Sequence, residues 1–157
     1  MQPGLLDYSR STCSIAASLE LIGEKWSLLV LREAFLGLRR FDDILAGVGC
    51  ARSVLTARLA TLVKNDILRR VPYREPGSRP RYEYAITAKG HEIFPIMVAL
   101  LQWGDKWNAP MGKPSLVLRH AGCKAQVRAE VRCTKAHGPL RANEVRALPG
   151  PSALRIA

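Results

Sequence analysis

The sequence lacks a long apolar run and a secretory start. No stretch of about 18 consecutive residues is apolar, so no membrane-spanning helix is expected. The opening MQPGLLDYSRSTC has no apolar run behind a basic start, which is not the pattern of a signal peptide. We therefore expect a cytoplasmic protein whose 157 residues form one domain of ordinary size with its own core.

Cysteine is also scarce, with Cys13, Cys50, Cys123 and Cys133 the four in the chain. In a cytoplasmic protein such a set is not a disulfide framework, because that compartment keeps thiols reduced. Each cysteine has to be judged by its own surroundings.

The usual signatures of catalysis are missing as well. The sequence shows no phosphate-binding loop, no nucleophile near a base and no paired carboxylates in an obvious site. Asp42 and Asp43 are neighbours on an expected helix, so their side chains point in different directions. We expect no enzyme and no cofactor.

Positive charge, by contrast, is abundant and lies in two blocks. The formal net charge is +11, of which residues 39–81 supply +6 and residues 111–157 supply +7, whereas the rest of the chain carries −2. Scattered basic residues are ordinary solvated surface. Two basic blocks are more typical of surfaces that bind a polyanion, and nucleic acid is the usual partner.

Apolar periodicity predicts four helices before residue 66. The first is capped by Ser11 or Thr12 and ends at Gly23, and the second is capped by Ser27 and ends at Gly37. The third, short helix contains Phe41 and Val48, and the fourth runs from about Ala51 to Asn65.

The fourth helix has one apolar face and one small, polar face. Leu55, Leu59 and Leu62 share the first, and the other carries small or polar side chains at Ser53, Ala57, Ala60 and Lys64, with Thr56 between the faces. Two helices joined by a short glycine-containing turn, the second with such an outer face, form the helix-turn-helix pattern. The outer face is small enough to enter a major groove.

A strand hairpin with a basic tip is predicted directly after this helix. ILRRVPYRE and RYEYAIT flank the turn PGSRP, and Arg74, Arg79 and Arg81 gather at the tip. A hairpin after a helix-turn-helix is a wing, which lies along phosphates or in the minor groove, where arginine is favoured.

A fifth helix is expected over residues 88–107, capped by Thr87 and kinked by Pro95. Its apolar stripe either completes the core or pairs with its copy in a second subunit, and we expect both. Beyond it, the alternation of AQVRAEVRC after SLVLRH predicts a small β-hairpin.

These segments, in this order, resemble the HxlR-type winged helix-turn-helix transcriptional regulators of the MarR-like superfamily. The resemblance spans CSIAASLELIGEKWSLLVLREAFLGLRRFDDIL, LTARLATLVKNDILRR and YREPGSRPRYEYAITAKGHEIFPIMVALLQWGDKW, from Cys13 to Trp107. It implies a mainly helical α+β fold with N-terminal and C-terminal dimerisation helices, and a homodimer on a palindromic operator in double-stranded DNA. Many relatives respond to electrophiles, oxidants or small metabolites, and Cys13 matches a cysteine that several of them use.

The chain departs from the family in two places. Ala51 stands where many members have a serine N-cap, which removes about 1 kcal/mol of capping unless Ser53 or a phosphate substitutes. The tail loosely resembles a zinc-ribbon-like extension of one branch of the family, but its cysteine pairs are broken at Cys123 and Cys133. We expect three segments: an arm over residues 1–12, the DNA-binding domain over 13–109, and an extension over 110–157 that has kept its shape without a metal. Zinc binding by the two tail cysteines with His120 and His137 is the weaker alternative.

The expected DNA contacts divide into two groups. Recognition-helix contacts with bases and phosphates are expected from Arg52, Ser53, Thr56, Ala57 and Arg58, and wing or backbone contacts from Arg40, Arg74, Arg79 and Arg81. For Arg58, pairing with an acidic residue inside the fold is the alternative. For all of them the alternative is ordinary solvated surface.

The sequence thus predicts a dimeric, sequence-specific DNA-binding regulator, most simply a repressor that responds to a small molecule or a thiol-reactive signal. Cys13 is the candidate redox sensor, because a thiol at a helix start feels the positive end of the helix dipole, which favours thiolate. The alternative is a winged-helix protein-interaction or assembly module without specific DNA binding.

Overall fold

A computed structural model describes residues 8–9, 11–77 and 79–156. The chain divides into two compact units, one formed by residues 21–129 and the other by residues 1–20 together with 130–157. Helix α1 (Ser14–Ile22) spans the boundary between them.

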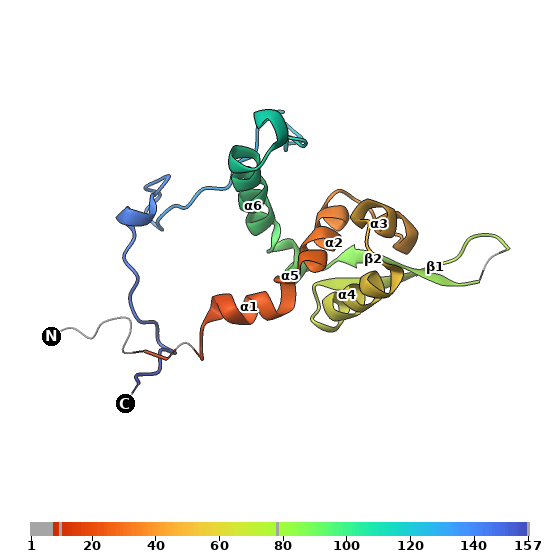
Figure 1. The fold of residues 1–157 in the computed structure, drawn as a ribbon, viewed down its shortest axis with the longest axis horizontal. Coiled ribbons are helices and arrows are strands. Elements are labelled where there is room, and N and C mark those ends of the chain that lie inside the picture. Colours follow the sequence, from red (N-terminus) through yellow and green to blue (C-terminus); the bar gives the residue numbers. More distant parts are fainter. Residues whose placement is uncertain (1–7, 10, 78, 157) are drawn as a thin grey trace. The chain divides into compact units, whose positions relative to one another are not determined.

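The larger unit contains a helix-turn-helix (Figure 1). Helix α2 (Lys25–Phe35) packs against both α3 (Phe41–Val48) and α4 (Arg52–Lys64), and the axes of α3 and α4 are bent by 114° at the short turn between them. Gly49 ends α3 in the left-handed conformation with φ +69°, a backbone geometry that glycine adopts without strain. The sequence predicted this helix pair and its turn.

A two-stranded antiparallel sheet follows α4. Strand β1 (Leu68–Tyr73) pairs with β2 (Arg81–Ile86) from Leu68↔Ile86 to Tyr73↔Arg81, which confirms the predicted hairpin. The segment before α3 lies along β2, since the Tyr84 amide donates to the Arg39 carbonyl at 2.8 Å. The wing is therefore fixed to the helix-turn-helix through the backbone.

The core lies between α2, α3, α4 and the start of β1. Its fully buried side chains are Val30, Leu31, Ile44, Leu55, Leu59, Leu62, Ile67 and Leu68. All but Ile67 and Leu68 are apolar positions of the predicted helices, and those two begin the predicted strand ILRRVPYRE. The burial of this set is the main stabilising contribution to the unit.

Three helix boundaries differ from the sequence-based prediction. Helix α1 begins at Ser14, so its N-cap position is Cys13 and not Ser11 or Thr12. Helix α2 begins at Lys25, and its N-cap is Glu24 instead of Ser27, which lies fully buried one turn further on. The predicted fifth helix is two helices, α5 (Ala88–His91) and α6 (Phe94–Trp107). Pro95 at the second position of α6 has no amide to donate and would clash with a continuing helix, so a new helix starts there instead of a kink. Thr87 caps α5 as predicted, because its hydroxyl accepts from the Gly90 amide.

The C-terminal hairpin that the alternation predicted is reduced to a single bridge. Arg119 and Gln126 form an isolated antiparallel bridge around the turn between them, and no described residue after 86 belongs to a strand. Beside this bridge, the His120 amide donates to the Ala125 carbonyl at 2.8 Å and the Val127 amide donates to the Leu118 carbonyl at 2.9 Å, so the predicted pairing forms over a few residues only. Gln102 of α6 also holds this chain, donating to the Val127 carbonyl at 3.2 Å and accepting from the Ala129 amide at 3.1 Å.

The smaller unit contains little regular structure apart from α1 and a short 3₁₀ turn, η3 (Ala142–Glu144). Its ends are joined by the Ser9 amide, which donates to the Leu154 carbonyl at 2.7 Å. No single described helix is long and apolar enough to cross a membrane. Helices α3 and α4 reach that length and composition only as a pair, and the bend between them is the turn of the helix-turn-helix.

Candidate nucleic-acid interface

Helix α4 turns one face to the core and the other to solvent. Leu55, Leu59 and Leu62 are buried, which fixes the rotation of the helix about its axis. Ser53, Thr56 and Ala57, like Ala60, are exposed on the other side, as the sequence predicted. The exposed face is therefore held in place by the apolar one and is free to meet a partner.

The N-terminus of α4 has no side-chain cap. Ala51 occupies the N-cap position with extended backbone (φ −65°, ψ 144°) and cannot accept a hydrogen bond from the first amides of the helix. The Thr56 hydroxyl donates backward to the Arg52 carbonyl at 2.9 Å, so it does not substitute for a cap. Uncapped amides at a helix start favour an anion such as a phosphate.

Arg52, the first residue of α4, lies against the first turn of α3. Its guanidinium donates to the Asp42 carboxylate at 2.8 Å and lies over the Phe41 ring, 4.9 Å from the centroid. Both charged side chains are about two-thirds exposed, at 66% and 65%. The pair is therefore accessible from solvent.

Arg40, the N-cap residue of α3, is held in the same manner by the wing. It forms an ion pair with the Glu75 carboxylate at 2.8 Å and lies 5.0 Å from the centre of the Tyr73 ring. In both cases one carboxylate and one aromatic ring fix the direction of an arginine, and a cation over a ring face adds a modest attraction.

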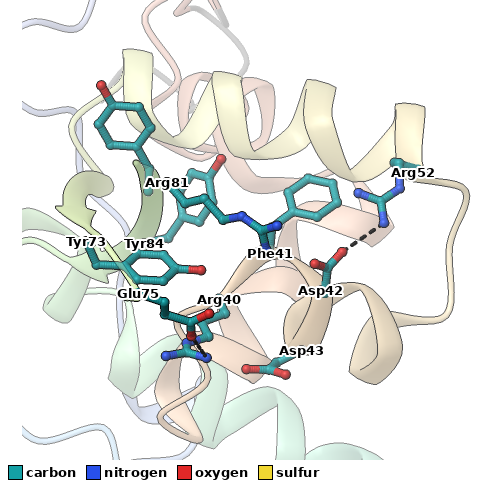
Figure 2. A pocket seen from close by; sticks show the side chains of 10 residues that line it. Arg40, Phe41, Asp42, Asp43, Arg52, Tyr73, Glu75, Arg81 and Tyr84 are labelled. Carbon is teal, nitrogen blue, oxygen red and sulfur yellow. Dashed lines mark hydrogen bonds and ion pairs between the residues drawn. The ribbon is translucent and has the colours of Figure 1, made fainter. Parts of the chain in front are cut away.

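These side chains surround a hollow of about 510 Å³, which we call the arginine hollow (Figure 2). It is lined by Arg40, Phe41, Asp42, Asp43, Arg52, Tyr73, Glu75, Arg81, Tyr82 and Tyr84. Its arginines come from three elements: the start of α3, the start of α4 and the wing. Three arginines face three carboxylates here, so the formal charge of the lining is zero.

The arginines at the tip of the wing are exposed. Arg74, Arg79 and Arg81 all lie on the surface of the hairpin, and Arg81 extends across the arginine hollow toward Phe41 (Figure 2). In the part of the chain that the structure describes, neither Arg79 nor Arg81 forms an ion pair with a carboxylate. Their charges are available to a ligand.

Arg58 takes a different place from the other recognition-helix residues. Its side chain is mostly buried and approaches the Glu24 carboxylate at 3.9 Å, the longest of the ion-pair distances in the described residues. Glu24 is itself 60% exposed, so this long contact lies at the surface of the fold, and the DNA contact of Arg58 stays a prediction.

Cys13, Cys50, Cys123 and Cys133 all lie in the described residues, and none of them forms a disulfide. Cys13 directly precedes α1 and is partly exposed. His120 and Cys123 approach each other at 3.2 Å between the ring Nδ1 and the thiol sulfur. Within the described ranges, no three His, Cys, Asp or Glu side chains gather as metal ligands would.

Sequence reasoning missed the partners of the arginines. Asp42 and Glu75 were not expected at the interface, and neither were the rings of Phe41 and Tyr73. The only available signal was the run RRFDD, which places Arg40, Phe41 and Asp42 side by side. The pairing of Asp42 with Arg52 joins residues of two helices, so it depends on their crossing angle and not on spacing along the chain.

Sequence comparison finds relatives along most of the chain. Residues 21–111 match the HxlR-like helix-turn-helix family. The uncharacterised HTH-type transcriptional regulator Rv3095 of Mycobacterium tuberculosis is 38% identical over 138 residues, covering 88% of this chain and 86% of that protein. The regulator sll1512 of Synechocystis is 42% identical over 96 residues, covering 60% of this chain and 70% of its own length.

Solved structures share the same architecture. The crystal structure of PA1607, a proposed transcription factor, superposes with a TM-score of 0.77 at 34% identity, covering 88% of this chain and 96% of PA1607. The redox regulator HypR in its oxidised form gives a TM-score of 0.56 at 25% identity and covers 62% of this chain and 100% of HypR. Together with the helix-turn-helix and wing described above, these matches show that the chain belongs to the HxlR-like helix-turn-helix family of transcriptional regulators, which are not enzymes.

Proposed function

We propose that the protein is a homodimeric, sequence-specific DNA-binding repressor. The observation that carries this proposal is the convergence of arginines from α3, α4 and the wing beside the exposed face of α4. A duplex that receives α4 in its major groove brings its phosphates past the wing, where Arg79 and Arg81 are available.

Base readout is assigned to the first two turns of α4. Arg52 is the side chain suited to guanine, and the small Ser53, Thr56 and Ala57 allow close approach to base edges and to a thymine methyl group. The uncapped amides next to Ala51 would bind a phosphate. Arg58, largely buried beside Glu24, would contribute a phosphate contact only from the flank.

Phosphate binding is assigned to the wing and to the start of α3. If Arg40, Arg74, Arg79 and Arg81 each approach a phosphate, a dimer neutralises about eight phosphates, and log affinity falls with log salt at a slope of about −7. The recognition helices of the dimer would lie about 34 Å apart, one turn of DNA, on a palindromic operator.

The dimer is inferred from the apolar surface of two helices. On α6, Ile96, Leu100 and Trp103 are between 48% and 57% exposed, and on α1 Ile15 and Leu19 are exposed as well. Apolar side chains that repeat along a helix and remain outside the core are typical of an interface with a second subunit.

Regulation is assigned to a small molecule or to a thiol-reactive signal. Cys13, partly exposed directly before α1, is the candidate sensor, and the similar protein HypR is a redox regulator. A change at α1 that shifts the dimer contact would alter the spacing of both recognition helices at once, which is sufficient to release an operator.

The test is a binding titration with the DNA upstream of the protein's own gene. Reduced protein is compared with protein treated with mild oxidant, and Cys13→Ser is carried in parallel. Tight binding that the oxidant abolishes only in the protein with Cys13 supports the thiol-switched repressor. Tight binding that is indifferent to oxidant supports the repressor and directs the search to a small ligand.

The wing assignment is tested in the same experiment by Arg81→Ala, with Lys64→Ala on the far end of α4 as the matched loss of charge. Arg81→Ala should reduce the salt slope by about 2 for a dimer, since each protomer loses one phosphate contact. If no protein in the series binds any DNA specifically, the protein-interaction module becomes the better account.

A further inference from the structure

We propose that Asp42 is a specificity-determining residue that keeps Arg52 from serving as a general phosphate contact. The inference rests on the DNA-binding function proposed above. It concerns residues of the arginine hollow that carry the wrong sign of charge for a surface that binds DNA.

The first observation is the charge of the arginine hollow. In a surface that only captured phosphates, the arginines would be surrounded by neutral or basic residues. Here Arg40 and Arg52 each have a carboxylate at 2.8 Å, and Arg81 is the one arginine of the lining without an ion pair to a described carboxylate. The carboxylates also face the approaching phosphates and repel them.

The second observation is the exposure of the Asp42–Arg52 pair. An ion pair at 65% and 66% side-chain exposure contributes little to folding, because water screens it and two long side chains lose freedom. The ion pair should instead affect DNA binding, because bound DNA would exclude the water that screens the two charges. There the carboxylate competes directly with phosphate oxygen for the same guanidinium.

The third observation is orientation. Phe41 lies under the Arg52 guanidinium while Asp42 accepts from one of its nitrogens, so the pair restrains the plane and direction of the group (Figure 2). A guanidinium restrained in this manner keeps other N–H donors for a base edge, where bidentate geometry matters. A phosphate would need it to turn away from Asp42.

It follows that Asp42 weakens binding to DNA of arbitrary sequence more than binding to the operator. On arbitrary DNA the contacts are with phosphates, and Arg52 contributes only if it leaves Asp42. On the operator, Arg52 reads a base while it remains beside Asp42. The carboxylate thereby raises the ratio of specific to non-specific affinity, which decides occupancy among many competing sites.

The experiment uses two duplexes of equal length: one that the wild-type full-length protein selects from a random library, and one of random sequence. Asp42→Asn should bind the random duplex on the order of ten-fold more tightly as a dimer, which corresponds to roughly two- to five-fold per protomer. Its salt slope on that duplex should become steeper by about 2, because one more phosphate contact forms in each protomer. Affinity for the selected duplex should change less, so the specificity ratio falls.

The chain offers a matched control in Asp43→Asn. Asp43 lies beside Asp42 in the first turn of α3 and lines the arginine hollow, but no described cation pairs with it. Its substitution removes the same formal charge and the same interaction with the helix dipole. Asp43→Asn should change the affinity for both duplexes by the same factor and leave the specificity ratio unchanged.

Two further variants separate positioning from structure. Asp42→Glu should restore a ratio near that of the wild type, because the carboxylate can still reach Arg52. In the Arg52→Ala background, Asp42→Asn should have no more effect than Asp43→Asn.

The outcomes are distinct. Equal effects of Asp42→Asn and Asp43→Asn on both duplexes would mean that only net charge matters, which overturns the inference and leaves the DNA-binding function standing. Loss of affinity for both duplexes in Asp42→Asn, with a normal circular dichroism spectrum, would also overturn it. A wild-type protein that binds neither duplex contradicts the proposed function and this inference with it.

Discussion

Helices α4 and α6 belong to the same unit and are similar in length, but they bury their apolar residues very differently. In α4, Leu55, Leu59 and Leu62 are at most 1% exposed. In α6, all of whose residues are described, Val98 is the only buried one, and Leu100 and Trp103 remain 48% and 57% exposed. The chain itself completes the surroundings of α4, whereas α6 keeps a face that only another surface can cover.

This difference teaches how the two helices are positioned. A DNA-reading helix must be held rigidly by its own subunit, because a small rotation would displace every side chain on its outer face. A helix that joins subunits must keep its apolar face outside the core. The four predictions below test that contrast, in order of expected effect.

The largest effect is expected in the core under α4. Leu59→Ala should lower the free energy of unfolding by about 2–5 kcal/mol, because it leaves a cavity among residues that cannot collapse into it. Urea denaturation of dilute protein measures the loss. The control is Leu100→Ala in α6, where a half-exposed side chain should cost about 0.5 kcal/mol in the isolated subunit. Equal losses of unfolding free energy in the two variants would contradict the difference in burial between α4 and α6.

The second prediction concerns self-association. Trp103→Ala should raise the dimer dissociation constant by about 30-fold, since truncating a large aromatic anchor of an interface typically costs about 2 kcal/mol or more. Sedimentation equilibrium measures the constant. Tyr82→Ala removes an aromatic side chain of the wing with similar exposure, 55% against 57%, and should leave the dimer unchanged. A wild-type protein that stays monomeric at every concentration would contradict the dimer.

The third prediction compares two glycines. A Cβ at Gly90 in α5 would lie 2.2 Å from the Ile67 carbonyl oxygen, a backbone atom that cannot move freely. Gly90→Ala should therefore destabilise the fold by about 1–3 kcal/mol. A Cβ at Gly104 in α6 meets nothing within 4 Å, so Gly104→Ala should be neutral or stabilise the helix by up to about 1 kcal/mol.

Thermal unfolding of the two variants at equal concentration measures both changes. If Gly104→Ala instead weakens self-association, the second subunit approaches α6 closely at that glycine. That result would show that the exposed face of α6 is buried by a second subunit, whereas the apolar face of α4 is buried by its own subunit.

The smallest effect is expected at the start of α4. Ala51 has the extended backbone of an N-cap without an accepting side chain, whereas Thr87 caps α5 through the Gly90 amide at 3.0 Å. Ala51→Ser should raise the free energy of unfolding by about 1 kcal/mol, measured by urea denaturation. No change would indicate that the amides already have another acceptor in solution.

Much of the fold was determined by the sequence itself. The repeat of Leu55, Leu59 and Leu62 specifies a helix and its buried face, because only one rotation of that helix hides all three. The apolar strands around PGSRP specify the hairpin in the same local manner. A pattern that depends only on one helix or hairpin and on its contact with water can be recognised in the sequence without knowing which other elements pack against it.

The failures in the C-terminal half have physical causes that the pattern does not contain. Pro95 permits either a kink or a new helix, and the packing of α5 against β2 and of α6 against α2 decides for two helices. The alternation after residue 124 permits a strand, but only its first residues pair with the segment before the turn, and Gln102 of α6 bonds the backbone at Val127 and Ala129.

The sequence by itself determined that this protein would place arginines around an exposed helix, since charge and periodicity are properties of the chain. Only the tertiary structure decided which of those arginines are paired with a carboxylate and which are available to a ligand. Arg52 meets Asp42 because α3 and α4 are bent by 114°, and Arg40 meets Glu75 because the wing lies beside the start of α3. An ion pair forms where two side chains meet in space, and distance along the chain does not specify that meeting.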